Sequence, residues 1–110
     1  MRMPNAGQAI VDVEKLRDYC LNPRHPRGRH KARVFHATLG LTDQHAEELQ
    51  AALLAATLEE DATPTERDDY GQRYVLDFMM RGPRGQARVR SSWIVRRGEG
   101  FPRLTTCYVL

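Results

Sequence analysis

Basic side chains and histidines are concentrated in one short stretch of the chain, residues 22–35. Within ten residues this stretch has five cations and two histidines, with no acid to neutralise them: Arg24, Arg27, Arg29, Lys31 and Arg33, with His25 and His30. Histidine exchanges a proton near neutral pH, and arginine binds phosphate oxygens through two parallel N–H groups. The stretch therefore has the residue types needed to hold a phosphate and to move a proton beside it.

The local sequence predicts a rigid loop that leads into a helix. Pro23, Pro26 and Gly28 exclude regular structure because proline fixes its own φ and restricts the residue before it. From Arg29 the residues suit a helix that ends at Gly40, and four of them are spaced to bury one side: Val34, Phe35, Thr38 and Leu39. Free N–H groups at the helix start add a partial positive charge. The alternative interpretation is an ordinary solvated surface, although five cations without acids repel one another.

A second group of basic and hydroxyl side chains lies in the last third of the chain. From Gln72 the hydropathy alternates with a period of two, which predicts antiparallel strands joined by turns at 82–85 and 98–102. One face of these strands is apolar and includes Trp93, either as a core residue or as a platform for stacking a nucleobase. The other face carries arginines and hydroxyls: Arg88, Arg90, Ser92 and Arg96, followed across the last turn by Arg103, Thr106 and Tyr108.

The helices and strands that must position these two groups predict an α+β fold. Helices are predicted over 13–21, over 29–39 and after Thr42, which has the signature of a helix cap. Residues 59–71 are acidic, polar and broken by Pro64, and are predicted to be a mobile loop. Three helices followed by a three- to four-stranded antiparallel meander, in a single domain of residues 1–110, is the expected architecture.

Composition and missing motifs narrow the functional classes. The net charge is +3, and nine of the fourteen acids lie between residues 43 and 69, which predicts one strongly positive face. No run approaches the ~20 apolar residues of a membrane span, so we expect no membrane partner and a cytoplasmic location, unless the chain is exported as a module of another chain. Cys20 and Cys107 are read as buried free thiols, with a disulfide left open. We expect no metal and no cofactor, since no ligand spacing or phosphate-binding glycine motif is present.

These residue types suit metal-independent cleavage of RNA. In that reaction the 2′-hydroxyl attacks the neighbouring phosphate, so the protein needs only a base, an acid and cations. The candidate catalytic residues are His30, His25, Lys31, Arg90, Thr106 and Tyr108. The candidate substrate-binding residues are Arg27, Arg29, Arg88, Ser92, Trp93, Arg96 and Arg103.

The chain also resembles a widespread bacterial domain family of unknown function. Residues 15–35 are similar to that family's opening, with its Leu-Asn-Pro-x-His-Pro-x-Gly-x-x-Lys-Ala-x-x-Phe motif, and residues 89–95 and 101–108 look like its ending. Members occur alone and as C-terminal modules of polymorphic toxins. The order of elements resembles the nuclease fold of barnase, EndoU, colicin E5/D and RelE. The resemblance implies metal-independent RNA cleavage and a small neutralising partner, and it covers these positions of the site: His25, Lys31, Arg90, Trp93, Arg103, Thr106 and Tyr108.

The leading hypothesis is therefore a ribonuclease toxin module, with RNA as substrate and a small acidic antitoxin or immunity-like protein as partner. The alternatives are a nucleic-acid-binding module without catalysis and a protein-interaction component whose basic face docks on an acidic partner. Any hypothesis in which the protein is a catalyst requires the loop before the second helix and the arginine-bearing strand face to meet at one cleft.

Overall fold

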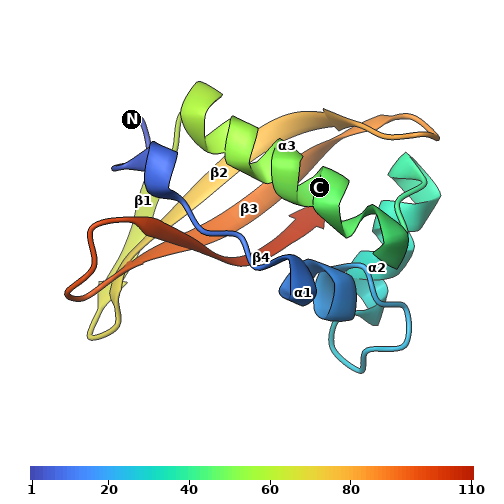
Figure 1. Ribbon diagram of the computed structural model, residues 1–110, viewed down its shortest axis with the longest axis horizontal. Coiled ribbons are helices and arrows are strands. Elements are labelled where there is room, and N and C mark those ends of the chain that lie inside the picture. Colours follow the sequence, from blue (N-terminus) through green and yellow to red (C-terminus); the bar gives the residue numbers. More distant parts are fainter.

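The computed structural model describes all 110 residues of the chain. The helical elements come first: η1 (Ala6–Gln8), α1 (Val13–Lys15), η2 (Leu16–Cys20), α2 (Arg29–Leu39), η3 (Asp43–His45) and α3 (Ala46–Glu59). The strands follow: β1 (Thr63–Asp68), β2 (Gly71–Arg81), β3 (Gln86–Arg96) and β4 (Pro102–Val109). In Figure 1, α3 lies across one face of the sheet, and α1 and α2 gather at one end of it. The fold is α+β, as predicted.

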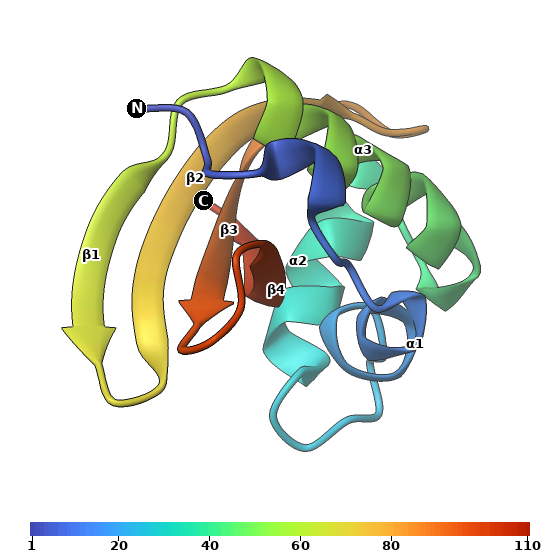
Figure 2. The ribbon, with the colours of Figure 1, turned by 60° about the vertical axis from the view of Figure 1, so that its left-hand side comes forward.

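The strands form one antiparallel sheet in the order β1-β2-β3-β4. β2 and β3 pair along their full length, from Gly71 opposite Arg96 to Arg81 opposite Gln86. The pairing of β3 with β4 is irregular after Ser92, where Thr105 is an extra residue and its hydroxyl donates to the Ser92 carbonyl at 2.9 Å. Bulges of this kind increase strand twist. The sheet curves accordingly, with β1 as its outermost strand (Figure 2).

The predicted alternation of the strands is confirmed, and it decides the position of Trp93. The core face of β2 is made of buried residues at every second position: Tyr74, Leu76, Phe78 and Met80. Trp93 has no exposed surface, and its Nε1 donates at 2.8 Å to the Ser91 hydroxyl, which donates at 2.7 Å to a backbone carbonyl of β2. Trp93 is therefore a core residue on the helix side of the sheet, which corrects the expectation that its ring contacts a substrate.

The helix boundaries follow the predicted signals. Gly40 ends α2 with φ 73°, a left-handed conformation that glycine adopts without strain. Thr42 caps the next helical segment, since its hydroxyl accepts from the Gln44 N–H and its own N–H donates to His45 Nδ1. The helix predicted over residues 13–21 instead has one α-helical turn followed by the π-helical turn η2. None of the helices has the length and apolar character needed to cross a membrane.

Two predictions about the secondary-structure elements are wrong, one about the buried side of α2 and one about residues 63–68. In α2, Phe35 and Leu39 are buried as predicted, but Val34 and Thr38 are exposed and Ala32 is buried instead, because the buried stripe runs through Ala32, Phe35 and Leu39. Residues 63–68 form an edge strand and not a loop. The strand is exposed along its whole length, so no hydrophobic alternation marks it in the sequence.

Candidate functional site

The loop before α2 is held by its own side chains. The Asn22 Oδ1 accepts the Arg24 N–H at 2.9 Å, and His25 Nδ1 accepts the N–H groups of Arg27 and Gly28, both at 3.0 Å. Because Nδ1 accepts both bonds, a neutral His25 carries its proton on Nε2. The histidine of the sequence motif therefore has a structural task, which is to close this turn.

Gly28 lets the loop pack directly against η2. A Cβ atom at this position would lie 2.0 Å from the backbone oxygen of Tyr19. The His25 ring stacks on the Tyr19 ring with 4.7 Å between centroids. The loop and the π-helical turn thus fix the position of Tyr19, which the sequence analysis did not single out within the helix predicted over residues 13–21. π-helical turns are frequent at functional sites, but nothing in the local sequence marks this one.

Lys31 lies where η2, α2 and β4 meet. Its Nζ donates to the Tyr19 hydroxyl at 3.1 Å and to the Thr106 hydroxyl at 3.2 Å, and lies 4.9 Å from the centre of the Tyr19 ring. No carboxylate lies within 4.0 Å of this ammonium group. An ammonium group has three donors, and one remains available for a ligand.

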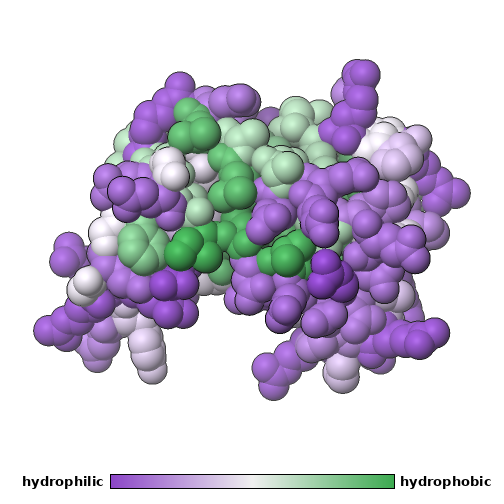
Figure 3. Space-filling view, in the orientation of Figure 1, coloured by the Kyte–Doolittle hydropathy of each residue, from purple (hydrophilic) through white to green (hydrophobic).

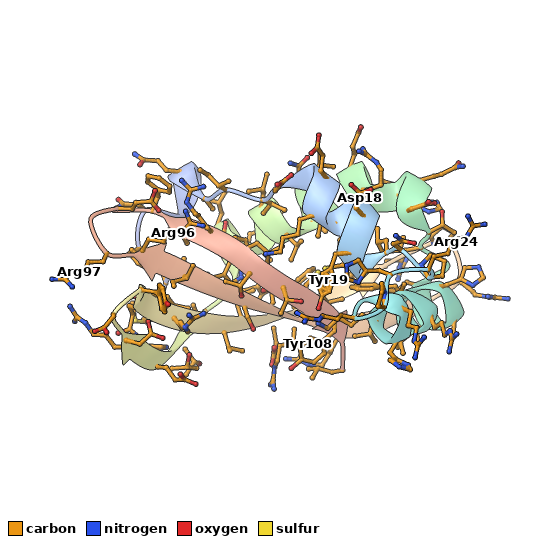
Figure 4. The ribbon with its side chains drawn as sticks, turned by 90° about the horizontal axis from the view of Figure 1, so that it is seen from below. Asp18, Tyr19, Arg24, Arg96, Arg97 and Tyr108 are labelled. Carbon is orange, nitrogen blue, oxygen red and sulfur yellow. The ribbon has the colours of Figure 1, made fainter.

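Beside Lys31 is a shallow hollow of about 290 Å³, which we call the lysine hollow; five residues line it: His30, Lys31, Val34, Tyr108 and Val109. The His30 side chain is exposed at its rim. Seen from below, Tyr19 and Tyr108 lie near the middle of the molecule, between Arg24 at the loop end and Arg97 at the turn end (Figure 4). The lower outline in Figure 3 is indented between these two ends.

Arg90 reaches the same region through Tyr108, its partner across β3 and β4. Its Nε and Nη2 donate to the two carboxylate oxygens of Asp77, each at 2.9 Å. The Asp77 carboxylate and, secondarily, the Tyr108 hydroxyl raise the pKa of Arg90 above its usual range, and the guanidinium lowers the pKa of Asp77. We expected Arg90 to hold the substrate phosphate; two of its five N–H donors bind Asp77, and the Tyr108 hydroxyl is a further neighbour of the guanidinium.

The structure brings together some of the other predicted residues and separates the rest. Ser92 is opposite Thr106, on the open face of the sheet. Arg88 is exposed on the same face and shares a hollow of about 450 Å³ with Arg90 and Asp77. Arg27 and Arg29 are exposed near the start of α2.

Arg96 and Arg103 lie away from the lysine hollow, near the turn between β3 and β4. Figure 4 shows Arg96 near this turn end, opposite Arg24. Arg103 forms two hydrogen bonds with Glu99, each at 2.9 Å, and its guanidinium lies 5.1 Å from the ring centre of Phe101. Neither arginine lines the lysine hollow.

The two cysteines are free and buried, and Cys20 interacts with Cys107, Thr106 and Lys31. Hydrogen bonds from Cys107 are the main cause of a lowered pKa at Cys20, and the charge of Lys31 acts in the same direction. The pKa of Cys107 is raised, because the Cys20 thiol is beside it and because it is buried. The prediction of buried free thiols is confirmed.

This architecture is also found in known proteins. No curated protein matches the chain. Among solved structures, it is similar to a chain of a contact-dependent growth inhibition toxin–immunity protein complex from Klebsiella pneumoniae 342, with 19% identity and a TM-score of 0.69. The similarity covers 94% of this chain and 95% of that chain, and it shows a shared fold. The model of the family DUF6883, a domain of unknown function, matches residues 2–110, and the chain belongs to this family.

Proposed function

We propose that this chain is a toxin-type domain that cleaves RNA without a metal ion. The observation that carries the proposal is Lys31, an ammonium group without a carboxylate partner, held by two hydroxyl groups at the edge of a hollow that also contains His30 and Tyr108. A protein that needed this lysine only for stability would usually pair it with an acid. An unpaired cation beside exchangeable protons instead suits the charge that develops on a phosphate.

The residues divide the work of the reaction as follows. His30 takes the proton of the 2′-hydroxyl as its oxygen bonds to phosphorus, and the bond from phosphorus to the 5′-oxygen breaks. The Tyr108 hydroxyl gives its proton to that 5′-oxygen, and the products are a 2′,3′-cyclic phosphate and a 5′-hydroxyl. Arg90 stabilises the Tyr108 phenolate that results, and Asp77 holds Arg90 in place. Lys31 binds the non-bridging phosphate oxygens.

The similar solved structure supports a place in a toxin–immunity pair and a protein partner. The similar solved structure is a toxin–immunity protein complex, which motivates the same pairing here. The exposed cations of the loop and of α2 would bind an acidic partner protein as readily as a phosphate backbone. Hydrophilic side chains cover this end of the molecule, at the lower right of Figure 3. A small acidic immunity-like protein that covers the lysine hollow would block substrate.

The test is cleavage of purified transfer RNA and total RNA in excess EDTA. We expect cleavage by the wild-type protein, cyclic phosphate ends, and loss of about 10²-fold or more in rate for His30→Ala and for Tyr108→Phe. Tyr70→Phe is the matched control, because Tyr70 is 73% exposed at the turn between β1 and β2. His25→Asn keeps an acceptor for the loop and removes the imidazole ring, so we expect it to retain activity.

Absence of cleavage by the wild type, or equal rates for His30→Ala and the wild type, would refute the proposal. RNA binding that depends on salt and on Lys31, without cleavage, would favour the alternative of a binding module.

A further inference from the structure

A second hollow, larger than the lysine hollow, lies on the other side of α2. Its volume is about 630 Å³, and it is bounded by η2, the loop before α2, α2 and η3; we call it the arginine hollow. Its floor consists of the buried side chains Leu21, Ala32 and Leu41. The volume lies in the range of small-molecule sites, which combine an apolar floor with a few polar groups.

The rim of this hollow is rich in cations that have no ion-pair partner. Four of its residues are basic: Arg17, Arg24, Arg33 and His36. None of the ion pairs in the chain, each with nitrogen and oxygen within 4.0 Å, includes any of them. Three arginines of the strands are paired with an acid, Arg73, Arg90 and Arg103, whereas the other strand arginines are unpaired like those of the hollow. The arginine hollow therefore keeps its donors free.

Two carboxylates, Asp18 and Asp43, line the same hollow without forming an ion pair. Carboxylates repel a phosphate but accept hydrogen bonds from the amino and imino groups of a nucleobase. A hollow that combines free arginines, free carboxylates and an apolar floor suits a ligand with an anionic end and a flat end that carries N–H donors. A nucleotide has both.

The arginine hollow is also close to the lysine hollow along the chain. Only α2 has residues at both hollows: Lys31 lines the lysine hollow, and the neighbouring Ala32 and Arg33 line the arginine hollow. The loop of residues 22–28, with Arg27 exposed on it, leads into this helix. A strand that crosses this loop would have a cation beside its phosphates on the way from one hollow to the other.

We propose that the arginine hollow binds one nucleotide of the RNA, with the base on the apolar floor and the phosphate on Arg24 and Arg33. This inference rests on the proposed function for the identity of the ligand, and it makes the hollow a subsite that selects which phosphate reaches Lys31. A free nucleoside monophosphate has the same chemistry and would bind the same groups more weakly.

The test uses the full chain and an RNA oligonucleotide with 2′-O-methyl groups at every position, which cannot be cleaved. We expect the backbone N–H signals of Leu21, Ala32 and Leu41 to shift in NMR spectra with this RNA, and more weakly with single nucleoside monophosphates. Inorganic phosphate alone should leave the signals of the floor unchanged. A short peptide of Asp and Glu serves as the probe for the alternative in which the hollow binds an acidic protein partner.

Binding measured at several salt concentrations gives a second readout. We expect Arg33→Gln to weaken binding of this RNA about tenfold and to reduce the slope of log K against log salt by about 0.7, the value for one contact with a single strand. Arg97→Gln removes the same charge at the far end of the molecule, where Figure 4 shows Arg97, and should reduce binding much less.

The outcomes separate this inference from the proposed function, because the probe cannot be cleaved. Shifts confined to residues around Lys31 and Tyr108, or equal effects of Arg33→Gln and Arg97→Gln, would overturn the subsite even if the wild type cleaves RNA. Floor shifts with inorganic phosphate alone, or with the acidic peptide and not with RNA, would also overturn it. Floor shifts with RNA would support the subsite even if no cleavage is found.

Discussion

Replacing Lys31 with methionine separates a functional role of the ammonium group from a structural one. Methionine keeps most of the apolar stem and removes the charge. The ammonium group has two hydroxyl partners, Tyr19 and Thr106, and no carboxylate within 4.0 Å. We expect the free energy of unfolding to fall modestly and the rate of RNA cleavage to fall strongly.

The expected stability change is a modest loss. Two hydrogen bonds contribute about 1 kcal/mol each, and the contact with the Tyr19 ring, at 4.9 Å from its centre, contributes about 0.5–1 kcal/mol. Lysine and methionine lose about the same rotamer freedom on folding, about 1.5–2 kcal/mol, so this cost is unchanged, and only relief of repulsion from the neighbouring cations of α2 opposes the loss. We therefore expect Lys31→Met to lower the free energy of unfolding by about 1–3 kcal/mol.

The expected loss of activity is larger. A group that stabilises charge only as it develops in the transition state is worth about 10²–10³ in rate, or about 2.7–4 kcal/mol. Urea unfolding and single-turnover cleavage measure the two quantities on the same protein. Lys15→Met is the matched control, because Lys15 is the one other lysine in the chain and lies on α1.

The reasoning fails if Lys31→Met cleaves RNA as fast as the wild type. It also fails if the variant loses more than about 3 kcal/mol of stability while it still binds RNA normally, because Lys31 would then be a structural residue that has no need of a ligand.

Three further predictions concern the residues that support the site. Gly28→Ala places a Cβ atom 2.0 Å from a backbone oxygen of η2, so we expect a lower unfolding midpoint in urea and altered aromatic signals in the near-ultraviolet circular dichroism spectrum. The pKa of Asp77 is lowered by Arg90, so its contribution to stability is present above the usual aspartate pKa of about 3.9 and is lost as pH falls below it. Wild type should accordingly exceed Asp77→Asn in stability at neutral pH, with the difference vanishing in acid titrations followed by urea unfolding. Ser91→Ala leaves the Trp93 N–H without its buried acceptor and should cost about 1–3 kcal/mol in urea unfolding, whereas unchanged stability would contradict this account of the core.

Most of the helices, strands and turns could be predicted from short-range sequence patterns. The period of two in β2 and β3, the proline-bounded loop, the left-handed Gly40 and the Thr42 cap all depend on residues close to one another in the chain. Strand β1 escaped prediction because an edge strand exposed on both faces has no hydrophobic pattern, and its pairing with β2 is visible only in the sheet.

The candidate site depends on contacts between distant segments. The sequence determined which residue types were available, because the histidines and cations before and within α2 can be read directly from it. Tertiary structure decided their roles. Lys31 meets Thr106, 75 positions away, whereas Arg90 is bound to Asp77 and Trp93 is sealed in the core. Side-chain charge is a property of a residue, but whether that charge is neutralised depends on which neighbours the fold brings within a few ångströms.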